Sequence, residues 1–326
     1  MNPVEALSIA PLAGDLDRLE QRLNGAVDHD DPFLAEVGSH LIGAGGKRIR
    51  PTLTMCSGYA ARGGDQPVSD DVITGGVACE LVHLGSLHHD DVIDEAETRR
   101  GVPSVNARWS NIVAILSGDF LLARASSLAS SLGADVAGLL ADTIGELCRG
   151  QVLELQHLWD VTRSEEDYSS AIEGKTASLF ATSCRIGGMV SGVDEPTLDA
   201  LTRYGQHVGL CFQIVDDCLD LTASDEKLGK PAGQDLVEGI YTLPVIYALS
   251  ERGSELGDLL GGPLDADRLD QARKLTTANG AVDTALAVAR DHAKKAGEAL
   301  SGADALDAGV TTGLCRLVDG LVNRDR

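Results

Sequence analysis

The sequence has few aromatic residues and no pattern typical of strands. Only 3% of its 326 residues are Phe, Tyr or Trp. No run alternates β-branched or aromatic residues with polar ones, as a half-buried strand would. These absences argue against a β-rich protein and favour an all-α fold.

Basic charge is also scarce, since 27 Lys and Arg face 50 Asp and Glu and the formal net charge is −23. A chain this acidic lacks the basic surface with which nucleic-acid-binding proteins release phosphate counterions. Small anionic substrates are not excluded, because a few arginines and lysines can reverse the field inside a cleft. We therefore expect no nucleic-acid partner.

Paired cysteines and a targeting segment are missing as well. The seven cysteines include no CxxC pair and lie scattered in apolar stretches, which is typical of buried thiols in a reducing compartment. The N-terminus has no basic segment before an apolar run, and charges such as Asp119 and Arg124 interrupt the longest apolar stretches. We expect a cytoplasmic protein with no membrane span.

Long segments with helical periodicity fill most of the chain. The clearest are residues 68–96, 110–132, 134–158, 175–191, 196–221, 264–277, 279–300 and 304–322. The segment 222–240 is rich in glycine and charge, which predicts a long functional loop. Nothing resembles a linker, so we expect one all-α domain over residues 1–326.

Two aspartate clusters stand out at the ends of predicted buried helices. They are Asp90, Asp91 and Asp94, and, in DDCLD, Asp216, Asp217 and Asp220. Residues four apart share a helix face, so the carboxylates at positions i and i+4 can converge. The C-terminal end of a helix disfavours carboxylates unless a cation is present. One such cluster is weak evidence, because acidic helix ends are often only solvated, but two copies favour a bound cation.

Magnesium is the cation that suits these clusters. It takes oxygen ligands and is usually held by one or two carboxylates together with substrate phosphates. His88 and His89 are adjacent and point to different sides of a helix, so they do not form the histidine pair that zinc would favour. We expect both to have structural or supporting roles.

The basic residues are placed as an anion site requires. In GGKRIRP, two glycines precede Lys47, Arg48 and Arg50, which combines exposed backbone N–H groups with cationic donors. A solvated basic turn is the alternative. Further candidates are Arg99 and Arg100 after the first cluster, Lys175 and Thr176 at a predicted helix start, and Lys230 in the loop.

The chain resembles the trans-isoprenyl diphosphate synthases, or polyprenyl synthetases, over nearly its whole length. The motifs that carry the resemblance are GGKRIRP, HHDDVIDEAETRRG, GDFLLARA, GKTASLF, FQIVDDCLD and GKPAGQDLVEGIYTLP. The resemblance implies an isoprenoid synthase-type helical bundle around a central cavity, usually as a homodimer. It also implies head-to-tail condensation of isopentenyl diphosphate with an allylic diphosphate (dimethylallyl, geranyl, farnesyl or geranylgeranyl).

The resemblance also assigns roles to single residues. It makes Asp90, Asp94, Asp216 and Asp220 ligands of about three magnesium ions, and Asp91 and Asp217 further ligands or supporting groups. It makes Gly46, Lys47, Arg50, His83 and Arg100 contacts of isopentenyl diphosphate. It places Arg99, Lys175, Thr176, Gln213 and Lys230 around the allylic diphosphate. One departure is Ile240, where many members carry a lysine, so one diphosphate contact is in doubt.

The residues before the first cluster bear on product length. Gly85 and Ser86 lie about one helical turn before Asp90, where a bulky aromatic residue would close the pocket for the growing chain. Their small size predicts a product of roughly twenty carbons or more, such as a quinone side-chain precursor. A geranylgeranyl diphosphate synthase and a non-catalytic subunit of a heteromeric synthase remain alternatives. The second DDxxD argues against a terpene cyclase.

Overall fold

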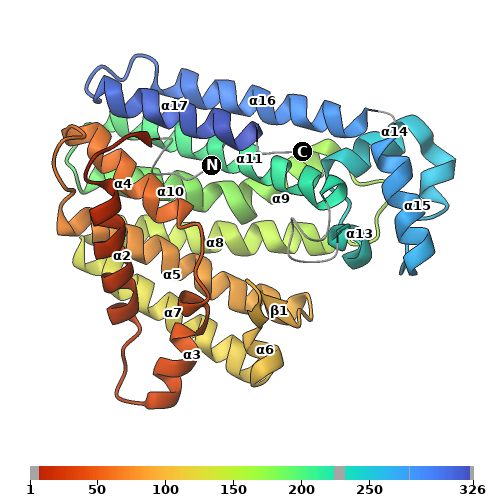
Figure 1. Ribbon diagram of the computed structural model, residues 1–326, viewed down its shortest axis with the longest axis horizontal. Helices are drawn as coiled ribbons and strands as arrows, with labels where there is room; N and C mark the ends of the chain where they lie inside the picture. The colour runs from red at the N-terminus through yellow and green to blue at the C-terminus, as the bar shows by residue number, and fades with distance from the viewer. Residues whose placement is uncertain (1–6, 224–231, 279, 324–326) are drawn as a thin grey trace. The chain divides into compact units, whose positions relative to one another are not determined.

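The computed structural model describes residues 7–223, 232–278 and 280–323, with the side chains of 252 and 254 left out (Figure 1). Within these ranges the fold is almost entirely helical, which confirms the all-α prediction. The strands of the described chain form one antiparallel hairpin, β1 (Thr98–Arg99) and β2 (Val102–Pro103). The chain divides into two compact units.

Unit 1 takes Met1–Ile144, Leu179–Gly205 and Ala299–Leu314. Its helices are α2 (Leu12–Ala26), α3 (Pro32–Gly43), α4 (Ile49–Arg62), α5 (Asp70–Ile93), α6 (Val105–Arg108) and α7 (Asn111–Ser131). It also includes the first part of α8 (Ala134–Gln156), most of α10 (Ser178–Met189) and the starts of α11 (Glu195–Thr222) and α17 (Ala308–Val322).

Helix α5 forms the centre of unit 1 and packs against α2, α4 and α7, with α7 alongside it in Figure 1. Leu81, Val82 and Leu84 are fully buried, as expected for a helix that is apolar on every side. The Ser69 hydroxyl caps α5 by accepting a hydrogen bond from the Val72 N–H at 3.4 Å. This packing fixes the C-terminal end of α5, which carries the first aspartate cluster.

Unit 2 takes Gly145–Ser178, Gln206–Glu298 and Cys315–Arg326. It contains the rest of α8, α9 (Glu165–Ile172), the π-helical turn η1 (Glu173–Ala177) and most of α11. After these come α13 (Gln234–Glu238), α14 (Leu243–Gly257), α15 (Ala266–Thr277), nearly all of α16 (Ala281–Leu300) and the end of α17. A core that includes Leu221, Leu236, Tyr241 and Val245 joins the end of α11 to α13 and α14.

Three sequence predictions need correction or completion. Helices α2, α3, α9 and α14 were not predicted, because they are short or because charged residues interrupt their apolar stripes. Lys175 and Thr176 do not open a helix: they lie in η1, inside a helical stretch that begins with α9 and continues into α10. The predicted loop 222–240 contains helix α13, while 224–231 lie outside the described residues.

The cysteine prediction is confirmed for five of the seven residues, which are buried. All seven are free thiols, but Cys148 is exposed and Cys315 is half-buried. Helix α7 is long and apolar enough to cross a membrane by length and composition, a weak criterion that core helices also meet. The absence of a membrane span therefore stays a prediction.

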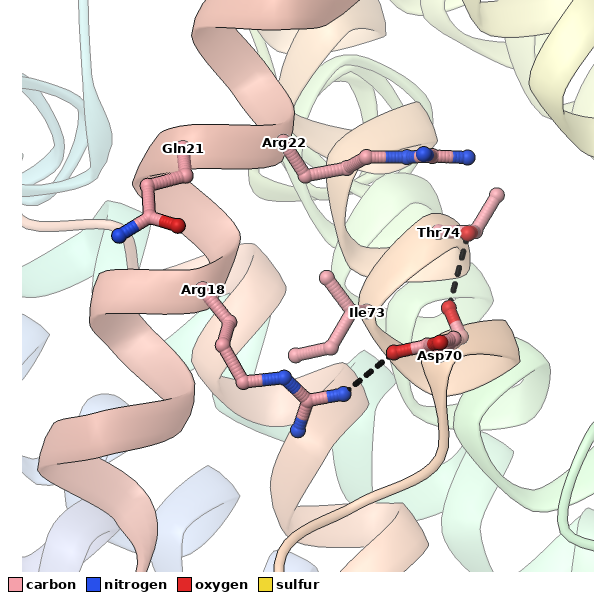
Figure 2. A pocket seen from close by; sticks show the side chains of 6 residues that line it. All are labelled: Arg18, Gln21, Arg22, Asp70, Ile73 and Thr74. Atoms are coloured by element: carbon pink, nitrogen blue, oxygen red, sulfur yellow. Dashed lines mark hydrogen bonds and ion pairs between the residues drawn. The ribbon is translucent and has the colours of Figure 1, made fainter.

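Figure 2 shows a surface cavity of about 410 Å³ between α2 and α5. Its Arg18 guanidinium lies 2.5 Å from Asp70 and 2.5 Å from the buried Asp15 carboxylate. Carboxylates thus surround the cation, and we assign this cavity to the packing of α2 on α5 rather than to anion binding.

Candidate active site

The first aspartate cluster ends α5 in unit 1. Asp90 and Asp94 are half-buried and lie one turn apart, and Asp94 caps the helix with its N–H 2.8 Å from the Asp90 carbonyl. Asp91 is fully buried, and its Oδ1 accepts hydrogen bonds from Arg99 Nε and Nη2, each at 2.6 Å. Burial raises the pKa of Asp91 against the opposing pull of Arg99. In this cluster Asp90 and Asp94 are therefore partly accessible, whereas Asp91 is buried and anchors Arg99 of β1.

The basic turn GGKRIRP is held by Arg48, which is only 7% exposed. Its Nε and Nη2 donate to Glu20 at 2.5 and 3.1 Å, and its Nη1 donates to Glu80 at 3.0 Å. Arg48 has a left-handed backbone (φ 47°), an unfavourable conformation that this bidentate pairing stabilises. Arg48 is thus bound to carboxylates, whereas Lys47 beside it is exposed.

Gly46 has to be glycine because two guanidinium groups flank it. A β-carbon at this position would lie 2.9 Å from Nη1 of both Arg48 and Arg100, and its φ of 156° also disfavours other residues. Arg100 Nη1 donates to the carbonyls of Leu41, at 3.2 Å, and of Gly45. The two arginines thereby fix the path of the turn that carries Lys47.

A cluster of cations surrounds His83, which lies about two turns before Asp90 on α5. Burial, with Arg50 and Arg100 nearby, lowers the pKa of His83 well below its usual range, so the ring is neutral. Burial also raises the pKa of Glu80, although Arg48, Arg50 and Arg100 oppose the rise. The Arg50 guanidinium lies 4.8 Å from the centre of the Phe180 ring. Lys47, Arg50, His83 and Arg100 therefore belong to one polar region of unit 1.

The two residues assigned to product length differ in surroundings. Ser86 is half-buried and donates to the His83 carbonyl at 2.9 Å. Gly85 is buried against α7, and a β-carbon there would lie 3.0 Å from the Gly118 carbonyl oxygen. The small size of Gly85 thus serves the close contact of α5 with α7, while its role in product length, like that of Ser86, stays a prediction.

The second aspartate cluster ends α11 in unit 2. Asp216 is half-buried, whereas Asp217 and Asp220 are buried. Asp220 Oδ2 accepts from the Asp235 N–H at 3.2 Å, which ties the cluster to the start of α13. Burial raises the pKa of Asp217, while its hydrogen bonds from Tyr168 and Gln213 lower it.

The turn η1 presents Lys175 and Thr176 beside this cluster. The Thr176 hydroxyl donates to Gln213 Oε1 at 2.7 Å, and Lys175 pairs with Glu154 of α8. Gly150 of α8 lies against the η1 backbone, so a β-carbon at 150 would come within 2.7 Å of the Ala171 carbonyl oxygen. This contact accompanies the π-helical turn, a local feature often found at functional sites.

The structure thus groups the predicted residues into two sets, one in each unit. Lys230 lies outside the described residues. Ile240 follows α13 and donates its N–H to the Asp235 carbonyl at 2.8 Å. Sequence reasoning missed the supporting residues Glu20, Glu80, Glu154, Arg163 and Tyr168. For Glu80, a lone acid inside an apolar helix segment was an available signal.

The residues fit a magnesium ion that completes its shell with phosphate and water. No group of three His, Cys, Asp or Glu side chains in the described ranges forms a ready metal cage. Asp91 Oδ2 is buried and accepts no hydrogen bond from the described protein atoms, so the first cluster retains an oxygen for a cation or water. Magnesium suits such a partial, all-oxygen donor set.

Comparison with known proteins defines the class first: the solved neighbours are isoprenoid synthase helical bundles. A family model described as polyprenyl synthetase matches residues 31–276, and the chain belongs to this family. A crystal structure of a Caulobacter crescentus polyprenyl synthase, complexed with calcium and isoprenyl diphosphate, has a TM-score of 0.92 at 32% identity, covering 99% of this chain and 98% of that one.

Two curated relatives are similar over most of the chain. The nonaprenyl diphosphate synthase of Mycobacterium tuberculosis is 41% identical over 266 residues, which cover 81% of this chain and 78% of that protein. The heptaprenyl diphosphate synthase component 2 of Bacillus subtilis is 37% identical over 293 residues, which cover 89% and 83%.

Proposed function

We propose that the protein is a trans-prenyltransferase that condenses isopentenyl diphosphate with an allylic diphosphate, head to tail. The product is a polyprenyl diphosphate of about twenty carbons or more, as the small residue Ser86 suggests. The observation that carries the proposal is the pairing of an aspartate cluster with cationic groups in each unit, in a chain of the polyprenyl synthetase family.

The basic residues of the two units would bind the two diphosphates. Lys47, Arg50 and Arg100, with neutral His83 as a hydrogen-bond donor, would hold isopentenyl diphosphate. Lys175, Thr176 and Gln213, with Arg99, would contact the allylic diphosphate. These Lys and Arg side chains would stabilise the departing diphosphate, so that the allylic C–O bond ionises. The isopentenyl double bond would then attack the allylic carbocation. The released diphosphate then accepts the proton that is lost.

Magnesium would bind at both aspartate clusters: Asp90 and Asp94 would hold it in unit 1, and Asp216 and Asp220 would hold it in unit 2. When bound, it neutralises the charge that develops on the leaving diphosphate. Asp91 and Asp217 would support these ligands, since each is buried and engaged by neighbouring side chains.

The active form would be a homodimer in a reducing, cytoplasmic compartment. Ile112, Ile115 and Leu116 lie on one face of α7, and Ile112 and Leu116 are 70% and 60% exposed. An exposed apolar stripe with this helical spacing is typical of a subunit interface. The free cysteines are compatible with a reducing compartment.

One relative is named as component 2 of a synthase, so a protein that needs a second chain for activity is the alternative function.

The test is to incubate the purified protein alone with labelled isopentenyl diphosphate and each allylic primer, with and without magnesium, and to separate the dephosphorylated products. We expect magnesium-dependent products of about twenty carbons or more. Absence of any product from the protein alone, with products after addition of a partner chain, would identify a dependent subunit. Absence in both cases would refute the function.

A further inference from the structure

We propose that Tyr168 is a positioning residue that couples the second aspartate cluster to Gln213 and Thr176, two of the residues assigned to the allylic diphosphate. Tyr168 is 1% exposed, and its hydroxyl donates to Asp217 Oδ2 at 2.6 Å. The inference rests on the proposed function, because it assigns a role in that same site.

The Tyr168 bond completes a directional chain of hydrogen bonds across three elements. Thr176 Oγ1 of η1 donates to Gln213 Oε1 of α11 at 2.7 Å. Gln213 Nε2 then donates to Asp217 Oδ1 at 2.7 Å. Because Tyr168 supplies the second oxygen of Asp217, both carboxylate oxygens are engaged and the carboxylate cannot rotate without breaking a bond.

The consequence for the metal site follows from helix geometry. Asp216 and Asp220 are one turn apart on α11, and Asp217 follows Asp216 directly and so points about 100° away from it around the helix. Asp217 thereby acts as an anchor that sets the rotation of the cluster, while its neighbours remain as the magnesium ligands. The same anchor orients the Gln213 amide and, through it, the Thr176 hydroxyl.

The start of α9 holds Tyr168 in place. Ser164 and Asp167 form a capping box, with the Asp167 N–H donating to Ser164 Oγ at 3.1 Å. Arg163 precedes the cap, and its guanidinium lies 5.6 Å from the centre of the Tyr168 ring, in the position where a hydrophobic staple would normally form. Arg163 is 4% exposed and donates to the Tyr241 carbonyl at 3.1 Å. The ring is therefore fixed independently of the hydroxyl.

This separation makes Tyr168→Phe a sharp test, since it removes one oxygen and keeps the ring. We expect the magnesium concentration for half-maximal rate and the KM for the allylic diphosphate to rise about tenfold, the scale for loss of one hydrogen bond to a charged group. The KM for isopentenyl diphosphate should change by less than about twofold, because the residues assigned to that substrate are not part of this hydrogen-bond chain. Manganese binding in the presence of pyrophosphate, followed by electron paramagnetic resonance, should weaken by a similar factor and needs no turnover.

The matched control is Tyr59→Phe. The Tyr59 hydroxyl donates to the buried Asp15 carboxylate in unit 1, so the variant removes the same kind of bond away from both aspartate clusters. It should lower thermal stability and leave the metal dependence and both KM values unchanged. A Tyr168→Phe protein with wild-type metal binding and allylic KM, or with an equal rise in both KM values, would overturn the proposal.

A second variant covers a failure of Tyr168→Phe to fold. Asp217→Asn keeps the size of the anchor and should weaken manganese binding and allylic affinity in the same ratio. The double variant should show no further loss from the tyrosine substitution, whereas additive losses would overturn the proposal. If the wild-type protein binds manganese and pyrophosphate but makes no prenyl product, the proposed function fails while the positioning role is still measured.

Discussion

Arg48 Nη1 lies 3.0 Å from Glu80 Oε1, and both side chains are buried in unit 1. Arg48, although it lies inside the basic motif GGKRIRP, is therefore a structural residue. It balances the charge of an acid from the core helix and bends the turn that carries Lys47.

Replacement of Arg48 by Ala should destabilise the protein. It leaves the Glu80 carboxylate buried without its closest cation, and loss of one partner of a buried pair costs about 3–5 kcal/mol. Urea unfolding measures the change. The matched control is Lys47→Ala, which removes an exposed cation and should alter stability by less than about 0.5 kcal/mol while raising the KM for isopentenyl diphosphate. Equal stability of Arg48→Ala and Lys47→Ala would show that the buried pair contributes nothing.

The first cluster predicts different outcomes for two adjacent aspartates. Asp90→Asn should lower kcat by on the order of a hundredfold with little loss of stability, since it would remove a metal ligand that is half-buried. Asp91→Asn should lower the unfolding temperature, because the Arg99 guanidinium then loses its buried partner. Steady-state kinetics and thermal unfolding of both variants separate the roles. Loss of stability in Asp90→Asn alone would reverse the assignment.

Ser86→Phe should shorten the product. The new ring would fill space one helical turn, 5.4 Å, from the first aspartate cluster, which is roughly the length of one isoprene unit. Chromatography of dephosphorylated products would show the distribution moving to shorter chains. Ser86→Ala is the control of unchanged size and should leave the distribution as in the wild type. An unchanged distribution of product lengths in Ser86→Phe would show that Ser86 does not line the pocket for the growing prenyl chain.

Acid should weaken unit 2 through His292. Its Nδ1 lies 3.1 Å from His207 Nδ1, and burial, with His207 and Lys295, lowers the pKa of His292 to about 4 although Asp291 opposes the change. The unfolded chain, with a histidine pKa of about 6.5, therefore takes up the proton first as the pH falls.

The contribution of His292 is complete above about pH 6.5 and is lost between about 6.5 and 4. We expect a loss of about 2 kcal/mol, after allowance for partial exposure of the ring. Urea unfolding at several pH values gives the free energy of unfolding as a function of pH. Over this range its slope against pH should be shallower for His292→Gln than for the wild type. Parallel slopes would assign the acid sensitivity to other groups.

The apolar face of α7 predicts the oligomeric state. Ile112→Glu with Leu116→Glu should convert a dimer to a monomer in sedimentation velocity, because charges would replace two exposed apolar side chains of the stripe. Phe33→Glu, at another exposed apolar residue, should leave the dimer intact. A wild-type protein that sediments as a monomer at micromolar concentration would contradict the dimer.

The sequence predicts the fold class and most of the long helices because their apolar periodicity is strong and extends over many turns. The family resemblance is likewise confirmed, since its motifs are spread from GGKRIRP to the loop after DDCLD. The cap of α5 at Ser69 was also predictable, because side-chain capping depends on local residues alone.

The supporting contacts could not be predicted in this way. Glu80 and Tyr168 meet Arg48 and Asp217 across separations of 32 and 49 residues, and no local pattern encodes such contacts. The turn η1 lies against Gly150 of α8, a contact that a helical pattern at Lys175 does not reveal. The contact of Gly85 with α7 was also not predictable, because helix rotation is set by tertiary contacts; its role in product length stays a prediction.

The central claim is that each of the two aspartate clusters binds magnesium together with diphosphate oxygens. The most direct measurement is a crystal structure with magnesium and a non-ionising allylic thiolodiphosphate. We expect metal ions about 2.0–2.1 Å from carboxylate oxygens of Asp90 and Asp94, and others at the same distance from Asp216, each also bound to diphosphate oxygens. Metal bound to one cluster alone, or a diphosphate that contacts neither, would contradict the account.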